Sequence, residues 1–173
     1  GPLHSEYLGG TQEHYLVPCP ECEAEIELCE NGLDFGHLKK MDGNYDMAEV
    51  LTGTRYKCPA CEVLLTEDKK RPMVNAGRYV PVPKDMRERD ERKKEQRQFF
   101  DPRHSTREGG KDHRVAFPGR VSLRISDFYC LHDDLTWGHM AQKIIEASKS
   151  PQKRKSLIID HFGTGWGETA AEI

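Results

Sequence analysis

Long apolar stretches are missing from this 173-residue sequence, in which hydrophobic residues make up 36% and charged residues 32%. No segment approaches the roughly 20 consecutive apolar residues of a membrane-spanning helix, and the first residues have neither the basic nor the apolar region of a secretory signal. We therefore expect a soluble protein that contacts no membrane and has only a small hydrophobic core.

The signature motifs of common enzyme classes are also missing. The sequence has no Walker motif, no H-E-x-x-H and no G-x-S-x-G. The glycine-rich stretch 163–169 lacks the Lys-Ser/Thr pair that would reach phosphates and Mg²⁺, so it does not predict a nucleotide site. A nuclease with a histidine base in His132-Asp133-Asp134 or at His161 is an alternative, but these residues lie near predicted helix ends, where surface and capping roles are ordinary. We predict no catalytic residues and no cofactor-binding residues.

Cysteines are what the sequence does contain, in two copies of the motif C-P-x-C: Cys19-Pro20-Glu21-Cys22 and Cys58-Pro59-Ala60-Cys61. Two residues between paired cysteines let a tight turn direct both thiolates at one ion, and a tetrahedral zinc ion takes four such ligands. The spacing predicts one structural Zn²⁺ per chain, and this closed site has no open position for catalysis. The predicted ligands are Cys19, Cys22, Cys58 and Cys61. The alternative is two redox or disulfide pairs, which the C-P-x-C pairing makes less favoured.

The remaining candidate ligands have simpler interpretations. Cys29 fits a strand position, and Cys130 lies among apolar residues and is interpreted as a small buried hydrophobe. His37 and Asp42 are interpreted as surface groups, because four cysteines already complete a tetrahedron.

Short strands surround both cysteine pairs. A strand over about 14–18 and a return strand over 25–28 form the first hairpin, and residues 55–57 and 63–65 form the second. The intervening residues 31–54 are interpreted as an extended excursion, in which Leu33 and Phe35 alternate as a strand and Met47–Leu51 could form one helical turn that Gly53 stops. A further strand contains Tyr79, Val80 and Val82.

The second half of the chain predicts a different pattern. Residues 83–114 combine alternating charges with almost no apolar residues, which predicts a solvated helix or a disordered insertion. Val121, Leu123 and Ile125 alternate with polar residues, as in a half-buried strand. Two helices follow, over 136–147, with Asp134 or Thr136 as the cap, and over 153–162.

Together these patterns predict an α+β fold: a small four-cysteine zinc ribbon of short antiparallel strands, then a strand and two helices. Residues 1–13 are interpreted as a tag remnant, from Gly1-Pro2-Leu3, and a flexible lead, so the chain is a candidate fragment of a longer protein. The predicted units are 14–82 for the ribbon with its excursion, 83–114 for the charged insertion and 115–173 for the strand and two helices.

Charge is divided unevenly between the two parts of the chain. Residues 1–70 contain 6 basic and 14 acidic residues, whereas the remainder has an excess of basic residues. A grip on a phosphate backbone needs Lys and Arg, so an acidic ribbon argues against direct nucleic-acid binding by this part.

The order of these motifs resembles that in a known family. Three stretches of the sequence are similar to the middle of the large terminase subunits of lambda-type tailed phages. They are 15–22 with the first cysteine pair, 55–61 with the second pair, and Lys70-Arg71-Pro72-Met73-Val74-Asn75-Ala76-Gly77-Arg78-Tyr79-Val80. Ile125–Tyr129 with Leu135-Thr136-Trp137, and Lys153–Leu157 with Gly167-Glu168-Thr169, resemble later parts of the same region. Ala170 departs from the pattern, since the family tends to carry an aromatic residue there.

The resemblance implies a function for a segment without an active site of its own. In that family an ATPase drives viral DNA into a procapsid and a metal-dependent nuclease cuts the concatemer, and this chain would join the two. It implies that the partners are other terminase domains and subunits and the portal or procapsid, with DNA as a further candidate. It also implies that the protein acts in the cytoplasm of an infected bacterium. A stand-alone zinc-ribbon adaptor that binds protein or nucleic acid is the alternative.

Overall fold

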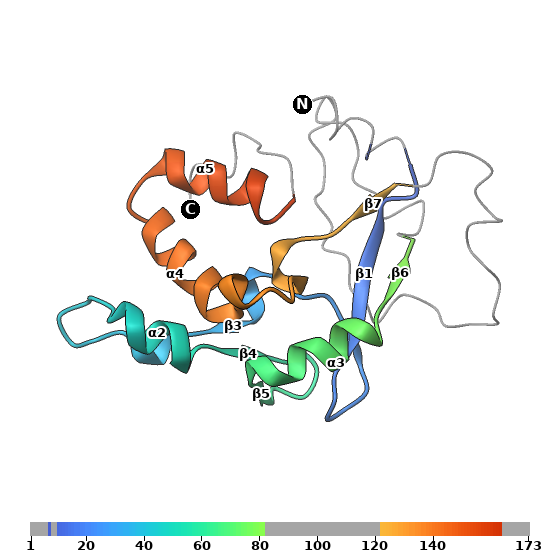
Figure 1. Cartoon of the computed structure of the whole chain (residues 1–173), viewed down its shortest axis with the longest axis horizontal. Coiled ribbons are helices and arrows are strands. Elements are labelled where there is room, and N and C mark those ends of the chain that lie inside the picture. Colours follow the sequence, from blue (N-terminus) through green and yellow to red (C-terminus); the bar gives the residue numbers. More distant parts are fainter. Residues whose placement is uncertain (1–6, 8–9, 82–121, 164–173) are drawn as a thin grey trace.

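Strand β1 (Glu13–Pro18) organises the first of two small sheets in the computed structural model, which describes residue 7 and residues 10–81 and 122–163 (Figure 1). It pairs antiparallel with β2 (Glu25–Ile26) and with β6 (Arg78–Val80), and parallel with β7 (Leu123–Arg124). His14 of β1 faces a partner in both β6 and β7, so these two strands lie on opposite edges of β1.

The second sheet has the order β3 (Leu33–Asp34), β4 (Arg55–Lys57) and β5 (Leu64–Leu65), with antiparallel pairs throughout. The first strand comes from the segment that the sequence predicts to be an extended excursion, and that prediction is only partly correct: Leu33 lies in a strand as expected, but Phe35 does not. Leu33 pairs with Tyr56, so the segment returns to complete the ribbon, and Phe35 lies beyond the strand, before the 3-10 helix η2 (Gly36–Leu38).

The same segment contains α2 (Met47–Gly53), a longer helix than the single turn expected from the sequence. Asp46 caps it, because its carboxylate accepts hydrogen bonds from the amides of Ala48 and Glu49. Gly53, which was expected to stop the helix, is its last residue. Its lack of a side chain leaves room for Leu38, which a Cβ atom would approach to 2.9 Å.

Three further helices complete the described structure. No helix was predicted where α3 (Lys70–Asn75) follows the 3-10 helix η3 (Glu67–Lys69). The two helices predicted in the second half are observed as α4 (Trp137–Ala147) and α5 (Pro151–Asp160). Thr136 caps α4 as expected, and Pro151 starts α5 two residues before the predicted beginning. Single-turn 3-10 helices, η1 (Glu30–Gly32), η5 (Asp127–Tyr129) and η6 (Asp133–Leu135), connect these elements.

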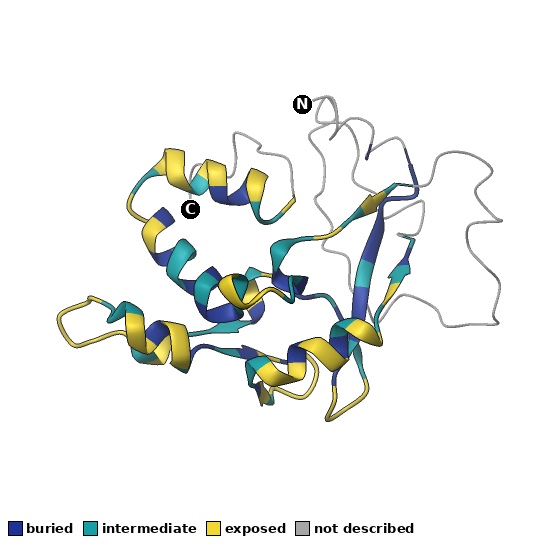
Figure 2. Ribbon diagram, in the orientation of Figure 1, coloured by how far each residue is buried: buried dark blue, intermediate teal, exposed yellow. Residues whose placement is uncertain are grey.

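One core joins the ribbon to the C-terminal helices. Trp137 of α4 is 1% exposed, and its ring lies 5.0 Å from that of Tyr56 in β4. Buried residues extend from there along β1 and the start of α4, as the dark blue ribbon of Figure 2 shows. The members of this core cluster are Val17, Cys19, Ile26, Leu28, Tyr56, Cys58, Leu65, Met73, Phe128, Tyr129, Trp137 and Met140.

Two buried tyrosine hydroxyl groups connect distant backbone segments within this core. The Tyr56 hydroxyl donates to the carbonyl of Glu27 and accepts from the amide of Cys29, at 3.0 Å each. The Tyr129 hydroxyl accepts from the amide of Leu28 and donates to the carbonyl of Tyr15. The two hydroxyl groups therefore satisfy buried backbone groups that the two-residue strand β2 is too short to pair.

The strand predicted around Leu123 is only partly correct. Leu123 and Ile125 are 52% and 50% exposed, so the alternation does not bury this face. β7 pairs with β1 over only two residues at the edge of the sheet, which gives its side chains little to pack against. Val121, the charged segment 83–114 and the glycines after residue 163 lie outside the described residues.

The predicted α+β class with a four-cysteine ribbon is confirmed. Within the part of the chain that the structure describes, no helix has the length and apolar character needed to cross a membrane.

Candidate metal centre

The two C-P-x-C turns have the same backbone structure. In the first, the amide of Cys19 donates to the carbonyl of Ala24 and the amide of Glu23 donates back to Cys19, at 2.9 Å each. In the second, the amide of Cys58 donates to the carbonyl of Val63 at 3.0 Å, and the amide of Glu62 donates to Cys58 at 2.9 Å. Each turn therefore holds its two cysteines in the same relative position at the end of a hairpin.

A left-handed residue follows each cysteine pair. Glu23 has a φ of 60° and Glu62 a φ of 61°, a conformation that residues with a Cβ atom rarely adopt. This conformation turns the chain back toward the return strand directly after the second cysteine. Its recurrence at equivalent positions shows that the two C-P-x-C turns share one local backbone conformation.

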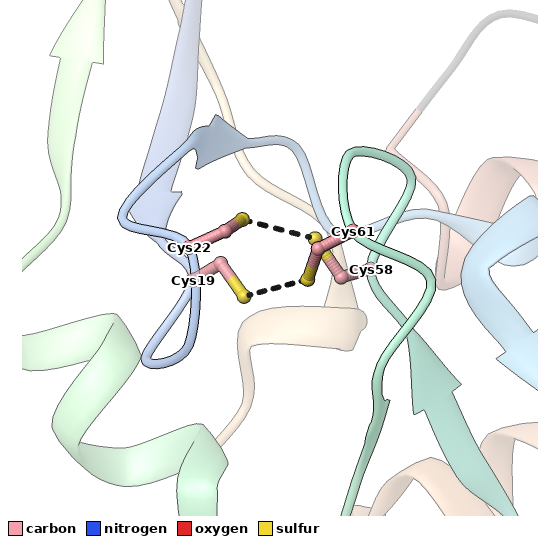
Figure 3. Close-up of side chains that lie close together, drawn as sticks. All are labelled: Cys19, Cys22, Cys58 and Cys61. Carbon is pink, nitrogen blue, oxygen red and sulfur yellow. Dashed lines mark hydrogen bonds between the residues drawn. The ribbon is translucent and has the colours of Figure 1, made fainter.

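The four sulfur atoms converge between the hairpins, as Figure 3 shows. All lie within 4.8 Å of one another, and the Sγ atoms are 3.9 Å apart in the pair Cys19 and Cys61 and in the pair Cys22 and Cys58. A tetrahedral zinc ion with bonds of about 2.3 Å places its sulfur ligands about 3.8 Å apart. The donor set and its spacing therefore fit a four-thiolate metal ion.

The pairing of the sulfurs also argues against two separate disulfides. All four cysteines are free, and each of the two 3.9 Å contacts joins one motif to the other. A disulfide or redox pair within one C-P-x-C motif would not bring the second motif to the same point. The convergence of both motifs is what a shared ion requires.

Burial divides the site into an inner and an outer half. Cys19 and Cys58 are 1% and 0% exposed and belong to the core, whereas Cys22 and Cys61 are exposed. Burial raises the pKa of the Cys58 thiol to about 12, although backbone amides, including that of Ala60 at 3.4 Å from Sγ, favour its thiolate. A hydrogen bond from the backbone of Ala24 lowers the pKa of the Cys22 thiol. A cation at the centre would supply the charge that the buried thiolates need.

The structure leaves the other candidate ligands away from the cluster. His37 is exposed and pairs with Asp34 at 2.9 Å, and Asp42 is exposed in a turn. Cys130 is half-buried, and Cys29 is exposed at the start of η1, so its predicted strand position is wrong. Among the described residues, the four motif cysteines are the only group of His, Cys, Asp and Glu close enough to share an ion.

The two histidines considered as catalytic bases make contacts that stabilise local structure. His161 lies 2.6 Å from Asp127 through its Nδ1 atom, and the amide of Asp127 donates to the carbonyl of His161 at 2.8 Å. His132 is exposed and accepts a hydrogen bond from the amide of Asp134. The first contact ties the end of α5 to η5, and the second forms a local turn.

Acidic side chains near the cysteine turns are partly paired. Glu25 binds Arg78 through two hydrogen bonds of 2.7 and 2.8 Å, and Glu62 lies 3.1 Å from Lys57. Glu21 and Glu23 are exposed at the first turn. The surface at the cysteines is therefore acidic, as the sequence indicates.

A buried lysine with a carboxylate partner lies beside the ribbon, and no pattern in the sequence indicates it. Lys70 is 1% exposed and binds Glu67, which also accepts the first amide of α4. The spacing of Glu67 and Lys70, three residues apart, is compatible with an ion pair on any helical turn. Lys70 is buried beside Trp137, whose ring centre lies 5.5 Å from its Nζ atom and which is 67 residues away in the chain, so no local pattern reveals this burial.

Part of the chain matches a known protein family. Residues 1–79 match the phage terminase large subunit gpA family, in its ATPase domain. The predicted resemblance to a terminase large subunit is thereby confirmed for this part of the chain. The terminase match includes all four cysteines of the cluster and ends in β6. Comparison with the curated proteins and with the solved structures gave no match.

Proposed function

We propose that this chain is a structural zinc-binding region of a phage terminase large subunit, which links the packaging ATPase to the nuclease while DNA is packaged into procapsids. The observation that carries the proposal is the convergence of four cysteine sulfurs within the part of the chain that matches the terminase family. The predicted ligands are Cys19, Cys22, Cys58 and Cys61, and the ion is structural.

The position of the metal centre supports a stiffening role. The first cysteine pair follows β1 in one sheet and the second follows β4 in the other, so an ion bound to both joins the two sheets. Cys19 and Cys58 lie in the core that also contains Trp137 of α4. Metal binding contributes folding free energy in small modules of this kind, so the ion would hold the ribbon and the C-terminal helices as one body.

The family match and the domain order together suggest what this body connects. Residues 14–82 would lie on the side of the ATPase, consistent with the description of the matched family, and residues 115–173 would lead to the nuclease. We propose other terminase domains and subunits and the portal or procapsid as partners, in the cytoplasm of the infected bacterium. DNA is a weaker candidate for the ribbon because its cysteine turns are acidic.

The test is a full-length terminase in which the metal site alone is removed. We expect Cys58→Ser in the parent protein to leave its ATP hydrolysis and DNA nicking intact and to abolish packaging of DNA into procapsids. Cys130→Ser, outside the cluster, is the matched control. Normal packaging by a variant that no longer binds zinc would contradict the linking role.

A stand-alone zinc-ribbon adaptor is the second candidate, because the family match stops at residue 79. The reading frame of the parent gene distinguishes the two. A terminase requires a Walker motif upstream and clustered aspartates downstream of this region, and an adaptor requires neither.

A further inference from the structure

A buried lysine lies between the ribbon and helix α4. The side chain of Lys70 is 1% exposed, and its Nζ atom donates to Glu67 Oε1 at 3.0 Å and to the carbonyl of Leu135 at 3.3 Å. The same atom lies 5.5 Å from the centre of the Trp137 ring. A buried ammonium group is tolerated only when it is paired, so Lys70 depends on these partners.

Glu67 binds the lysine and the helix at the same time. While Oε1 accepts from Lys70, Oε2 accepts from the backbone amide of Trp137 at 2.9 Å. Trp137 is the first residue of α4, and a carboxylate at a helix N-terminus is favoured by the unpaired amides and the helix dipole. One carboxylate therefore fixes α3 and the start of α4 together.

The chain places Glu67 close to the second cysteine pair. β5 follows Cys61, and Glu67, the first residue of η3, lies two residues after the end of that strand. β5 pairs with β4, and Cys58 directly follows β4. Tyr56, within β4, lies against Trp137. The hairpin that holds Cys58 and Cys61 is therefore continuous with both residues, Tyr56 and Glu67, that contact the start of α4.

We propose that Glu67 and Lys70 are positioning residues that couple metal binding at the four cysteines to the docking of α4 and the attached α5. Metal binding orders the second hairpin, the hairpin sets the position of Glu67, and Glu67 with Lys70 holds the N-terminus of α4. The inference rests on the metal site of the proposed function and adds to it a route by which the ion acts on the C-terminal helices. Coupling of this kind is reciprocal, so weakening the pair must also weaken metal binding.

The test measures zinc affinity, by competition with a chromogenic chelator, and hydrogen exchange in α4 of the zinc-bound chain. Glu67→Gln keeps one acceptor but cannot pair with Lys70 and cap Trp137 at once. We expect a loss of zinc affinity of about tenfold, in the usual range of coupling between sites, and faster exchange in the first turn of α4. Asp68→Asn, in the same 3-10 helix but with a 70% exposed side chain, is the control, and its zinc affinity should stay within about twofold of the wild type.

A second substitution separates the charge pair from a general loss of stability. Adding Lys70→Met to Glu67→Gln removes the unpaired ammonium group, so the double variant should regain at least part of the zinc affinity. Lys70→Met alone leaves Glu67, which is partly exposed, able to cap Trp137 and should fold even if Glu67→Gln does not. It is expected to show an intermediate loss of affinity.

The outcomes distinguish this inference from the proposed function. Faster exchange in α4 with wild-type zinc affinity in both Glu67→Gln and Lys70→Met would overturn the coupling, because the pair would then stabilise the helix alone. A wild-type chain that binds no zinc would instead overturn the metal-binding function on which the inference rests.

Discussion

Replacement of Gly138 by alanine tests the contact between α2 and α4. A Cβ atom at this position would lie 2.1 Å from the carbonyl oxygen of Leu51, and 2.8 and 2.9 Å from the carbonyl carbon and Cα atom of that residue. Ordinary contacts of a Cβ atom lie between about 3.4 and 4 Å. Because all three neighbours are backbone atoms of α2, the clash is relieved only if one helix moves by about 1 Å or more.

Two opposing terms set the size of the effect. Alanine favours the helix by about 1 kcal/mol relative to glycine. Overpacking a tight site costs about 1 to 3 kcal/mol, and a clash with backbone belongs at the upper end. The displacement of α2 would also disturb the cluster of Val50, Ala141 and Ile145 between the helices. We therefore expect Gly138→Ala to lower the free energy of unfolding by about 2 kcal/mol, which is a large share of the stability of a small domain.

The assay is urea denaturation of the zinc-saturated chain, followed by tryptophan fluorescence and circular dichroism. Gly36→Ala is the matched control, because a Cβ atom there has nothing within 4 Å. A Gly138→Ala variant as stable as the wild type, or more stable, would refute the close approach of the two helices.

Two further substitutions test other parts of the fold. Glu62→Gly should leave zinc affinity unchanged and raise the free energy of unfolding by up to about 1 kcal/mol, since glycine adopts the left-handed conformation without strain. Glu62→Val should lower the free energy of unfolding. A valine variant more stable than the glycine variant in denaturation would contradict the turn geometry. Tyr129→Phe should lower the free energy of unfolding by about 1 to 3 kcal/mol, because the amide of Leu28 and the carbonyl of Tyr15 lose their buried partner. Unchanged stability of Tyr129→Phe in thermal denaturation would show that water replaces the hydroxyl.

Features that depend on neighbouring residues could be predicted from the sequence. The cysteine spacing specifies turns that form locally, and both turns have the expected structure. Thr136 caps α4 because its hydroxyl needs only the amide of His139, three residues away. The apolar residues of that helix recur with the helical period, and Trp137, Met140, Ala141 and Ile145 among them are buried.

Features that depend on distant contacts could not be predicted. β3 contains only Leu33 and Asp34, and its pairing with Tyr56 and Arg55 has no local signal. Lys70 resembles any surface lysine in sequence, yet it is 1% exposed, beside the distant Trp137 ring and the carbonyl of Leu135. The alternation around Leu123 resembled that of a half-buried strand, yet the position of β7 at a sheet edge leaves the side chain exposed.

Native mass spectrometry of the purified chain, with and without a disrupted cysteine cluster, tests the central claim most directly. We expect one zinc ion per wild-type chain, and loss of both the ion and the ordered ribbon in Cys58→Ser, because Cys58 is a buried ligand shared with the core. Cys130→Ser should keep its zinc. A Cys58→Ser variant that retains metal and fold would contradict the four-cysteine site.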